Sequence, residues 1–244
     1  MTKKLLNDLS RENSLLNDLS RENTLQLDSI LSSGIPWLKL DLEIPKFSIE
    51  VLNDAVESSV GWHSQWDSHY AQPDPSSQTD SWDGKVLFGP KNWNEWTPKI
   101  LSDRIEDEPG LAKKYRRDLD FAWHIDIDHP VRKWVNSFLD DDAINLVSYY
   151  VLGPQGYIQP HYDNTTGNKW LNKMYAAIAW PDGCEFGFLD WGNAPIQEGD
   201  VFLINNYQHP HWVINRGTQP RIVMDINCDL TKIQDLIKRS FLRR

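Results

Sequence analysis

Three side chains in the second half of the chain have the types and spacing of a metal site. His161 and Asp163 stand two positions apart, and in a strand such positions point to the same face, so an imidazole and a carboxylate can reach one ion. His211 follows fifty residues later, at the start of a predicted strand. Two histidines and one carboxylate form the facial triad that holds Fe(II) and leaves coordination positions open. The pattern predicts that His161, Asp163 and His211 bind a catalytic metal ion.

An arginine at a suitable distance completes the pattern. Arg221 lies ten residues beyond His211, across a predicted turn, so we expect it on the neighbouring strand. Its rigid fork can hold a carboxylate through two parallel hydrogen bonds. An open Fe(II) site beside a carboxylate clamp meets the needs of 2-oxoglutarate as a co-substrate, with O2 in the last open position.

Rival sets of residues fit this chemistry less well. A second His-x-Asp, formed by His124 and Asp126, lies in a polar stretch before the strand-rich half begins. The rival distal histidine, His209, has Gln219 ten residues on, where a carboxylate clamp should be. Among the seven histidines of the chain, only the set that ends in Arg221 combines all these features.

Short strands are expected to position these residues. Runs of β-branched and aromatic residues, separated by clusters of Gly, Pro and Asp, occupy residues 144–152, 173–180, 184–189, 200–204, 211–214 and 221–227. Close spacing of short strands with turn signals indicates a sandwich or barrel. The residues up to His161 are expected to form a turn over residues 156–160.

The N-terminal half is predicted to be helices and loops. Residues 5–13 recur almost unchanged as residues 15–23, which we interpret as a duplication within a surface helix. Helices are expected at residues 49–60, 131–139 and, at the C-terminus, 231–244. Residues 62–100 hold five of the twelve tryptophans among many turn formers and are predicted to be long loops.

Composition excludes several classes of protein. A net charge of −10 argues against nucleic acid or an anionic membrane as the main partner. Two cysteines cannot form a disulfide framework, and no apolar run reaches the length of a membrane span. These features favour a cytoplasmic protein that acts on a small molecule or peptide, while the oligomeric state stays open.

The strand-rich half resembles the aspartyl/asparaginyl β-hydroxylase-like branch of the Fe(II)/2-oxoglutarate oxygenases, which includes free-proline cis-hydroxylases. The resemblance covers about residues 143–227. Its motifs are residues 153–161, 181–184, 198–200 and 211–215, followed by Arg221. It implies a mainly β protein with flanking helices around a double-stranded β-helix (jelly-roll or cupin-like) core. It further implies iron on the three predicted ligands and 2-oxoglutarate on Arg221.

This resemblance divides the chain into an N-terminal repeat-containing helix (residues 1–33) and a single oxygenase domain (residues 34–244). Two positions depart from the family pattern. Many members have glycine in place of the metal carboxylate, whereas Asp163 is present here, as in the free-amino-acid hydroxylases. Where the family often has Arg-x-His, this chain has Lys173 and Tyr175, and we expect the Tyr175 hydroxyl to bind the co-substrate carboxylate.

Two other functions stay open on the residues alone. One is a cupin-like metal protein, an isomerase or sugar binder, without 2-oxoglutarate chemistry. The other is an inactive binding module that interacts through the N-terminal repeat. Arg221 argues against the first and the intact ligands argue against the second. The leading hypothesis is a dioxygenase that hydroxylates a C–H bond of an amino acid, peptide or protein side chain, with release of succinate and CO2. The sequence leaves open whether residues 62–100 form the substrate cleft.

Overall fold

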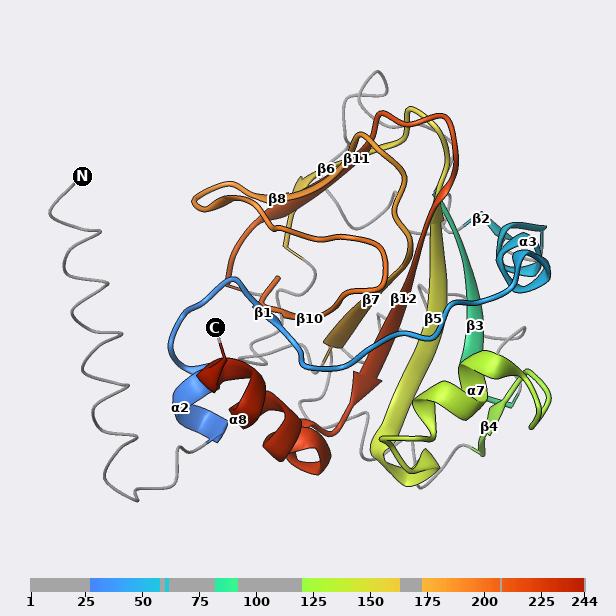
Figure 1. The fold of residues 1–244 in the computed structure, drawn as a ribbon, viewed down its shortest axis with the longest axis horizontal. Helices are drawn as coiled ribbons and strands as arrows, with labels where there is room; N and C mark the ends of the chain where they lie inside the picture. Colours follow the sequence, from blue (N-terminus) through green and yellow to red (C-terminus); the bar gives the residue numbers. More distant parts are fainter. Residues whose placement is uncertain are drawn as a thin grey trace, which may run out of the picture.

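Two antiparallel β-sheets face each other in the computed structural model, and helices cover one of them (Figure 1). The structure describes residues 27–57, 60–61, 82–91, 120–162, 173–206 and 208–243. The repeat at residues 5–23 lies outside them, as do most of the tryptophan-rich residues 62–100.

The larger sheet, called here the major sheet, has the strand order β1-β10-β7-β12-β5-β3-β2, with β4 paired to β3. Its strands are β1 (Trp37–Lys39), β2 (Val60–Gly61), β3 (Trp82–Pro90), β4 (Phe121–Trp123), β5 (Ile144–Leu152), β7 (Lys173–Ala179), β10 (Val201–Ile204) and β12 (Arg221–Cys228). The four-stranded minor sheet has the order β6-β11-β8-β9. It contains β6 (Tyr157–His161), β8 (Cys184–Phe188), β9 (Gly192–Asn193) and β11 (His211–Asn215).

The chain alternates between the two sheets from β5 onward. It runs from β5 in the major sheet to β6 in the minor sheet, back to β7, across to β8 and β9, and so on to β12. Two facing antiparallel sheets connected in this way form a jelly roll. The predicted fold class, a mainly β protein with a double-stranded β-helix core and flanking helices, is confirmed.

Alternation along the strands gives the major sheet two different faces. On β7, Tyr175 and Ala177 pack in the inner cluster between the sheets, whereas Met174 and Ile178 pack in the outer cluster. The outer cluster is completed by the helices α2 (Leu27–Leu31), α3 (Ile49–Glu57), α7 (Pro130–Val135) and α8 (Gln234–Leu242). Figure 1 shows α3 and α7 on the side of the major sheet that faces away from the minor sheet. None of the described helices is long and apolar enough to span a membrane.

Two strands lie where turns or loops were expected. The nine-residue strand β3 pairs with β5 inside the stretch predicted as loops, and its buried segment Val86–Phe88 explains why it forms despite the flanking glycines. The strand β6 replaces the turn predicted at residues 156–160 and includes Pro160. It is an edge strand of the minor sheet, where a residue without an N–H group is tolerated.

The side chain of Asn215 ties the end of β11 to two turns. Its Nδ2 donates to the carbonyl oxygens of Leu152, Gly153 and Gln219 at 2.9–3.1 Å. Its Oδ1 accepts from the Gly217 N–H at 2.9 Å and from the Cys184 thiol at 3.3 Å. Because Asn215 is fully buried, water cannot replace these bonds. The residue fixes the crossing from β11 to β12 against the end of β5.

Replacement of this amide should therefore destabilise the whole barrel. We expect Asn215→Ala to lower the free energy of unfolding by about 3 kcal/mol, because buried carbonyl and amide groups lose their partner. Asn193→Ala is the matched control, since the Asn193 side chain is exposed and donates to the carboxylate of Glu185, and it should change stability by less than about 0.5 kcal/mol. Urea unfolding measures both values, and equal effects of the two variants would contradict this role.

Candidate metal and co-substrate site

Two of the predicted metal ligands lie side by side in the minor sheet. His161 ends β6, and His211 begins β11 directly opposite it. The two imidazole rings are 4.3 Å apart between centroids. His211 is only 4% exposed and stacks on Phe186, with ring centroids 5.2 Å apart and the ring planes 10° from parallel. Register and stacking thus hold two imidazoles together at the inner side of this sheet.

A backbone contact sets the tautomer of His161. Its Nδ1 lies 2.7 Å from the carbonyl oxygen of Gln159. A carbonyl only accepts, so Nδ1 carries the proton and Nε2 carries the lone pair that can coordinate a metal ion. Metal-binding histidines usually have such a hydrogen bond on their second nitrogen. The structure therefore presents His161 in the form that a metal site requires.

The third predicted ligand, Asp163, lies outside the described residues. The strand β6 ends at His161, so the argument that both ligands share one face of a strand stays a prediction. Within the described part of the chain, no three His, Cys, Asp or Glu residues are placed so that they could hold a metal ion. The structure thus brings together two members of the predicted triad.

The predicted clamp, Arg221, is buried between the two sheets. Its side chain is among the largest fully buried ones, at 2% exposure, and its guanidinium carbon lies 5.4 Å from the ring centre of Tyr175 and 5.0 Å from that of Trp180. Burial lowers its pKa to about 9, against a smaller raising effect of Asp225, so the group stays a cation at neutral pH. A buried cation is costly unless an anion reaches it.

Two buried polar atoms at this clamp lack a partner. Among the described residues, nothing hydrogen-bonds to the Nε of Arg221 or to the hydroxyl of Tyr175. Both groups can donate, and the guanidinium lies over the tyrosine ring. A carboxylate from a ligand would satisfy both donors at once. Arg221 and Tyr175 therefore fit the carboxylate-binding role that the sequence predicted for them.

The clamp and the histidine pair lie on opposite walls of the barrel. Arg221 was expected on the strand next to that of His211, and this was wrong, because β11 pairs with β6 and β8 whereas β12 pairs with β5 and β7. Aromatic contacts connect the walls: Tyr175 and Phe186 have ring centroids 5.2 Å apart, and Phe186 stacks on His211. Both halves of the site thus contact the same inner cluster between the sheets.

Sequence reasoning missed several residues of this interior. Trp180 and Phe186 contact the clamp and the distal histidine, and a buried ion pair joins Lys173 to Asp225. Alternation with Tyr175 could have placed Lys173 on the inner face of β7. No sequence signal gives the register that sets Asp225 opposite Tyr175.

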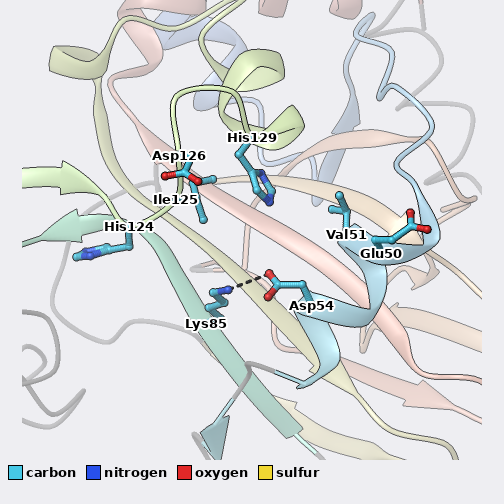
Figure 2. Close-up of a pocket in the computed structure, with 8 residues that line it drawn as sticks. All are labelled: Glu50, Val51, Asp54, Lys85, His124, Ile125, Asp126 and His129. Atoms are coloured by element: carbon cyan, nitrogen blue, oxygen red, sulfur yellow. Dashed lines mark hydrogen bonds and ion pairs between the residues drawn. The ribbon is translucent and has the colours of Figure 1, made fainter.

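The rival His-x-Asp lies on the surface, outside the barrel. A hollow of about 390 Å³ lies between α3, β3 and the segment from β4 to α7. Figure 2 shows the residues that line it: Glu50, Val51, Asp54, Lys85, His124, Ile125, Asp126 and His129. The imidazole of His124 extends away from the other side chains, and an ion pair of 2.9 Å joins Lys85 to Asp54. None of these residues belongs to the inner cluster.

The second rival, His209, also has a different contact. Its Nε2 lies 3.0 Å from the carbonyl oxygen of Gly34 and therefore donates to it. This bond ties the segment before β11 to the segment before β1. Neither rival histidine therefore replaces His161 or His211 as a partner for Arg221 inside the barrel.

Comparisons with known proteins agree with this arrangement. Residues 131–230 match the family model described as "Aspartyl/Asparaginyl beta-hydroxylase". No curated protein sequence matches the chain significantly.

Solved structures give only loose similarities. The viral collagen prolyl hydroxylase of Paramecium Bursaria Chlorella virus-1 is 14% identical over 80% of this chain and 96% of its own, with a TM-score of 0.41. A prolyl-4-hydroxylase of Pseudomonas putida is 10% identical over 83% and 96%, with a TM-score of 0.37. A 2OG-Fe(II) oxygenase family protein of Burkholderia pseudomallei is 12% identical over 84% and 90%, with a TM-score of 0.36.

These TM-scores are too low to support a conclusion about activity. The family match and the geometry of the site are therefore the observations that bear on function. Residues 131–230 contain the entire minor sheet, the clamp and all three predicted metal ligands. This part of the chain is similar to the aspartyl/asparaginyl β-hydroxylase family.

Proposed function

We propose that this protein uses Fe(II), 2-oxoglutarate and O2 to hydroxylate a C–H bond of an amino acid, a peptide or a protein side chain, with release of succinate and CO2. The observation that carries the proposal is the buried guanidinium of Arg221, which has no hydrogen-bond partner at Nε among the described residues and shares one barrel with two adjacent histidines. A carboxylate clamp opposite an imidazole pair suits a co-substrate with an anionic distal end.

The donor set fits Fe(II). His161 and His211 would supply two imidazole nitrogens, and Asp163 would supply the carboxylate of a facial triad. When bound, the iron provides the site at which O2 is reduced while 2-oxoglutarate is oxidatively decarboxylated, and this drives hydroxylation of the substrate. The hydrogen bond from His161 to the Gln159 carbonyl keeps the imidazole oriented for this role.

The remaining residues bind, orient and exclude water. Arg221 would hold the distal carboxylate through two N–H groups, and the Tyr175 hydroxyl would donate a third hydrogen bond. Phe186 and Phe188 are at most 3% exposed and close the interior beside His211. A dry interior strengthens the interaction between the guanidinium and the carboxylate and protects the reaction from water.

We further propose a small molecule or a peptide as the substrate, with no nucleic acid and no membrane as a partner. The net charge of −10 would repel a phosphate backbone or an anionic lipid surface. Two exposed aromatic side chains adjoin the segments that carry the histidine pair: Tyr162 follows His161 directly, and Trp191 contacts His209, two residues before His211, with ring centroids 5.9 Å apart. Such side chains suit contact with an organic substrate rather than with a polyanion.

An anaerobic titration tests the function directly. Fe(II) is added to the metal-free protein, followed by 2-oxoglutarate, and the visible charge-transfer band of the chelated 2-oxo acid is recorded. We expect a band that saturates with 2-oxoglutarate, and succinate release when O2 and a substrate are then supplied. Bound iron without any band would contradict the proposal and favour a cupin-like metal protein instead.

The distal histidine should be needed for the metal but not for the fold. We expect His211→Ala to lose the charge-transfer band and at least about 100-fold of the iron affinity, because one of three protein ligands is removed. Its far-UV circular dichroism should stay that of a β protein. His124→Ala removes the rival histidine on the surface and should retain both the band and the affinity. Loss in His124→Ala instead would place the metal outside the barrel.

The clamp should act on the co-substrate and not on the metal. We expect Arg221→Met to raise the KM for 2-oxoglutarate by about 100-fold, because a bidentate charged contact is lost, while the iron affinity changes by less than about threefold. Arg221→Lys keeps the charge but loses the two-pronged hydrogen bonding, so its KM for 2-oxoglutarate should lie between those of the wild type and Arg221→Met. Tyr175→Phe removes one hydrogen bond and should raise the KM by about fivefold. Equal losses of iron and 2-oxoglutarate binding in Arg221→Met would refute the clamp.

A further inference from the structure

A second, partly buried cation lies on the same face of the major sheet as the clamp and is already paired. Lys173, at the start of β7, forms an ion pair with Asp225, and their side chains are 17% and 3% exposed. The Lys173 ammonium also lies 5.6 Å from the ring centre of Tyr150. The lysine is therefore held by an anion and by an aromatic face on the inner side of the major sheet.

Asp225 shares the inner face of β12 with the clamp. Arg221 and Asp225 are four residues apart on β12 and so point to the same face. Asp225 is also the cross-strand partner of Tyr175, over whose ring the Arg221 guanidinium lies at 5.4 Å. The charge of Asp225 raises the pKa of Arg221 against the larger lowering effect of burial. One carboxylate thus lies on the same sheet face as two cations and acts on the charge of both.

The structure shows which of the two cations forms an ion pair with Asp225. Asp225 pairs with Lys173, and no ion pair joins Arg221 to any carboxylate of the described residues. Without the lysine, a buried aspartate beside a buried arginine would be strongly driven to pair with it. Such an internal pair would occupy the fork that a ligand carboxylate needs.

Resting on the proposed function, we propose that Lys173 is a positioning residue for the co-substrate: it holds Asp225 and thereby keeps the Arg221 fork open for the distal carboxylate of 2-oxoglutarate.

Four proteins test this role: the wild type, Lys173→Met, Asp225→Asn and the double variant. The dissociation constant of 2-oxoglutarate is measured anaerobically on the Fe(II)-loaded proteins from the charge-transfer band, and iron affinity is measured without 2-oxoglutarate. We expect Lys173→Met to weaken 2-oxoglutarate binding by about tenfold or more, because Asp225 now competes with the ligand. Iron affinity should change by less than about threefold.

The double variant separates competition from simple damage to the site. With Asp225→Asn added, the competitor is gone, so 2-oxoglutarate affinity should return to within about threefold of the wild-type value. Lys173→Arg keeps a cation for Asp225 and should also bind close to the wild-type level. Pyruvate, which lacks the distal carboxylate, should bind all variants alike. A double variant as weak as Lys173→Met would overturn the proposal.

Asp225→Asn alone keeps the test decisive if Lys173→Met does not fold. The proposal expects this variant to bind 2-oxoglutarate as tightly as the wild type or more tightly, since the clamp has lost its internal rival. A loss of about tenfold or more would show that Asp225 supports the clamp instead and would overturn the proposal. A wild-type protein that binds iron but no 2-oxoglutarate would overturn the proposed function itself. If the wild type binds 2-oxoglutarate and Lys173→Met binds it with the same dissociation constant, only the role of the lysine is overturned.

Discussion

The site depends on a guanidinium that is kept charged between two β-sheets. Arg221 is removed from water, and burial alone makes its charged form costly. The aromatic faces of Tyr175 and Trp180 offset part of that cost, and the more distant carboxylate of Asp225 offsets more. No described carboxylate closes directly on the fork. The interior is therefore built around a cation that, on the proposed function, pairs with the distal carboxylate of 2-oxoglutarate.

The topology makes such a cation useful. Because consecutive strands alternate between the sheets, residues that follow one another closely in sequence reach opposite walls of one space. The ten residues from His211 to Arg221 thus cross the whole barrel instead of forming a hairpin. The segment between β11 and β12 needs a defined course from one sheet to the other. The buried amide of Asn215 provides it through hydrogen bonds to both adjoining turns and to the end of β5. Packing around Phe186 then sets how far apart the two walls lie.

Much of this arrangement follows from the sequence, and the rest depends on register. The predicted strand at residues 144–152 is β5 itself, because a continuous β-branched and aromatic run leaves little ambiguity. Period-two alternation gives the face of a residue but not its sheet, which is why Arg221 was placed beside His211 rather than opposite it. The strands β3 and β6 were missed because Gly and Pro weigh against a strand unless its place in the sheet is known. The diagonal contact of Lys173 with Asp225 likewise needs the pairing of β7 with β12, and the position of Asp163 remains a prediction.

The two faces of the major sheet also bear on how the protein tolerates its own chemistry. Met174, Met224 and Cys228 all pack on the outer face, among the helices, so a layer of backbone separates their sulfur atoms from the space between the sheets. Burial raises the pKa of both Cys184 and Cys228 to about 12, which keeps them as thiols, the form that oxidants attack least readily. On the proposed function, aromatic and aliphatic side chains face the space between the sheets, whereas the sulfur atoms of Met174, Met224 and Cys228 lie behind the major sheet. This arrangement would spare them from oxidants formed during turnover.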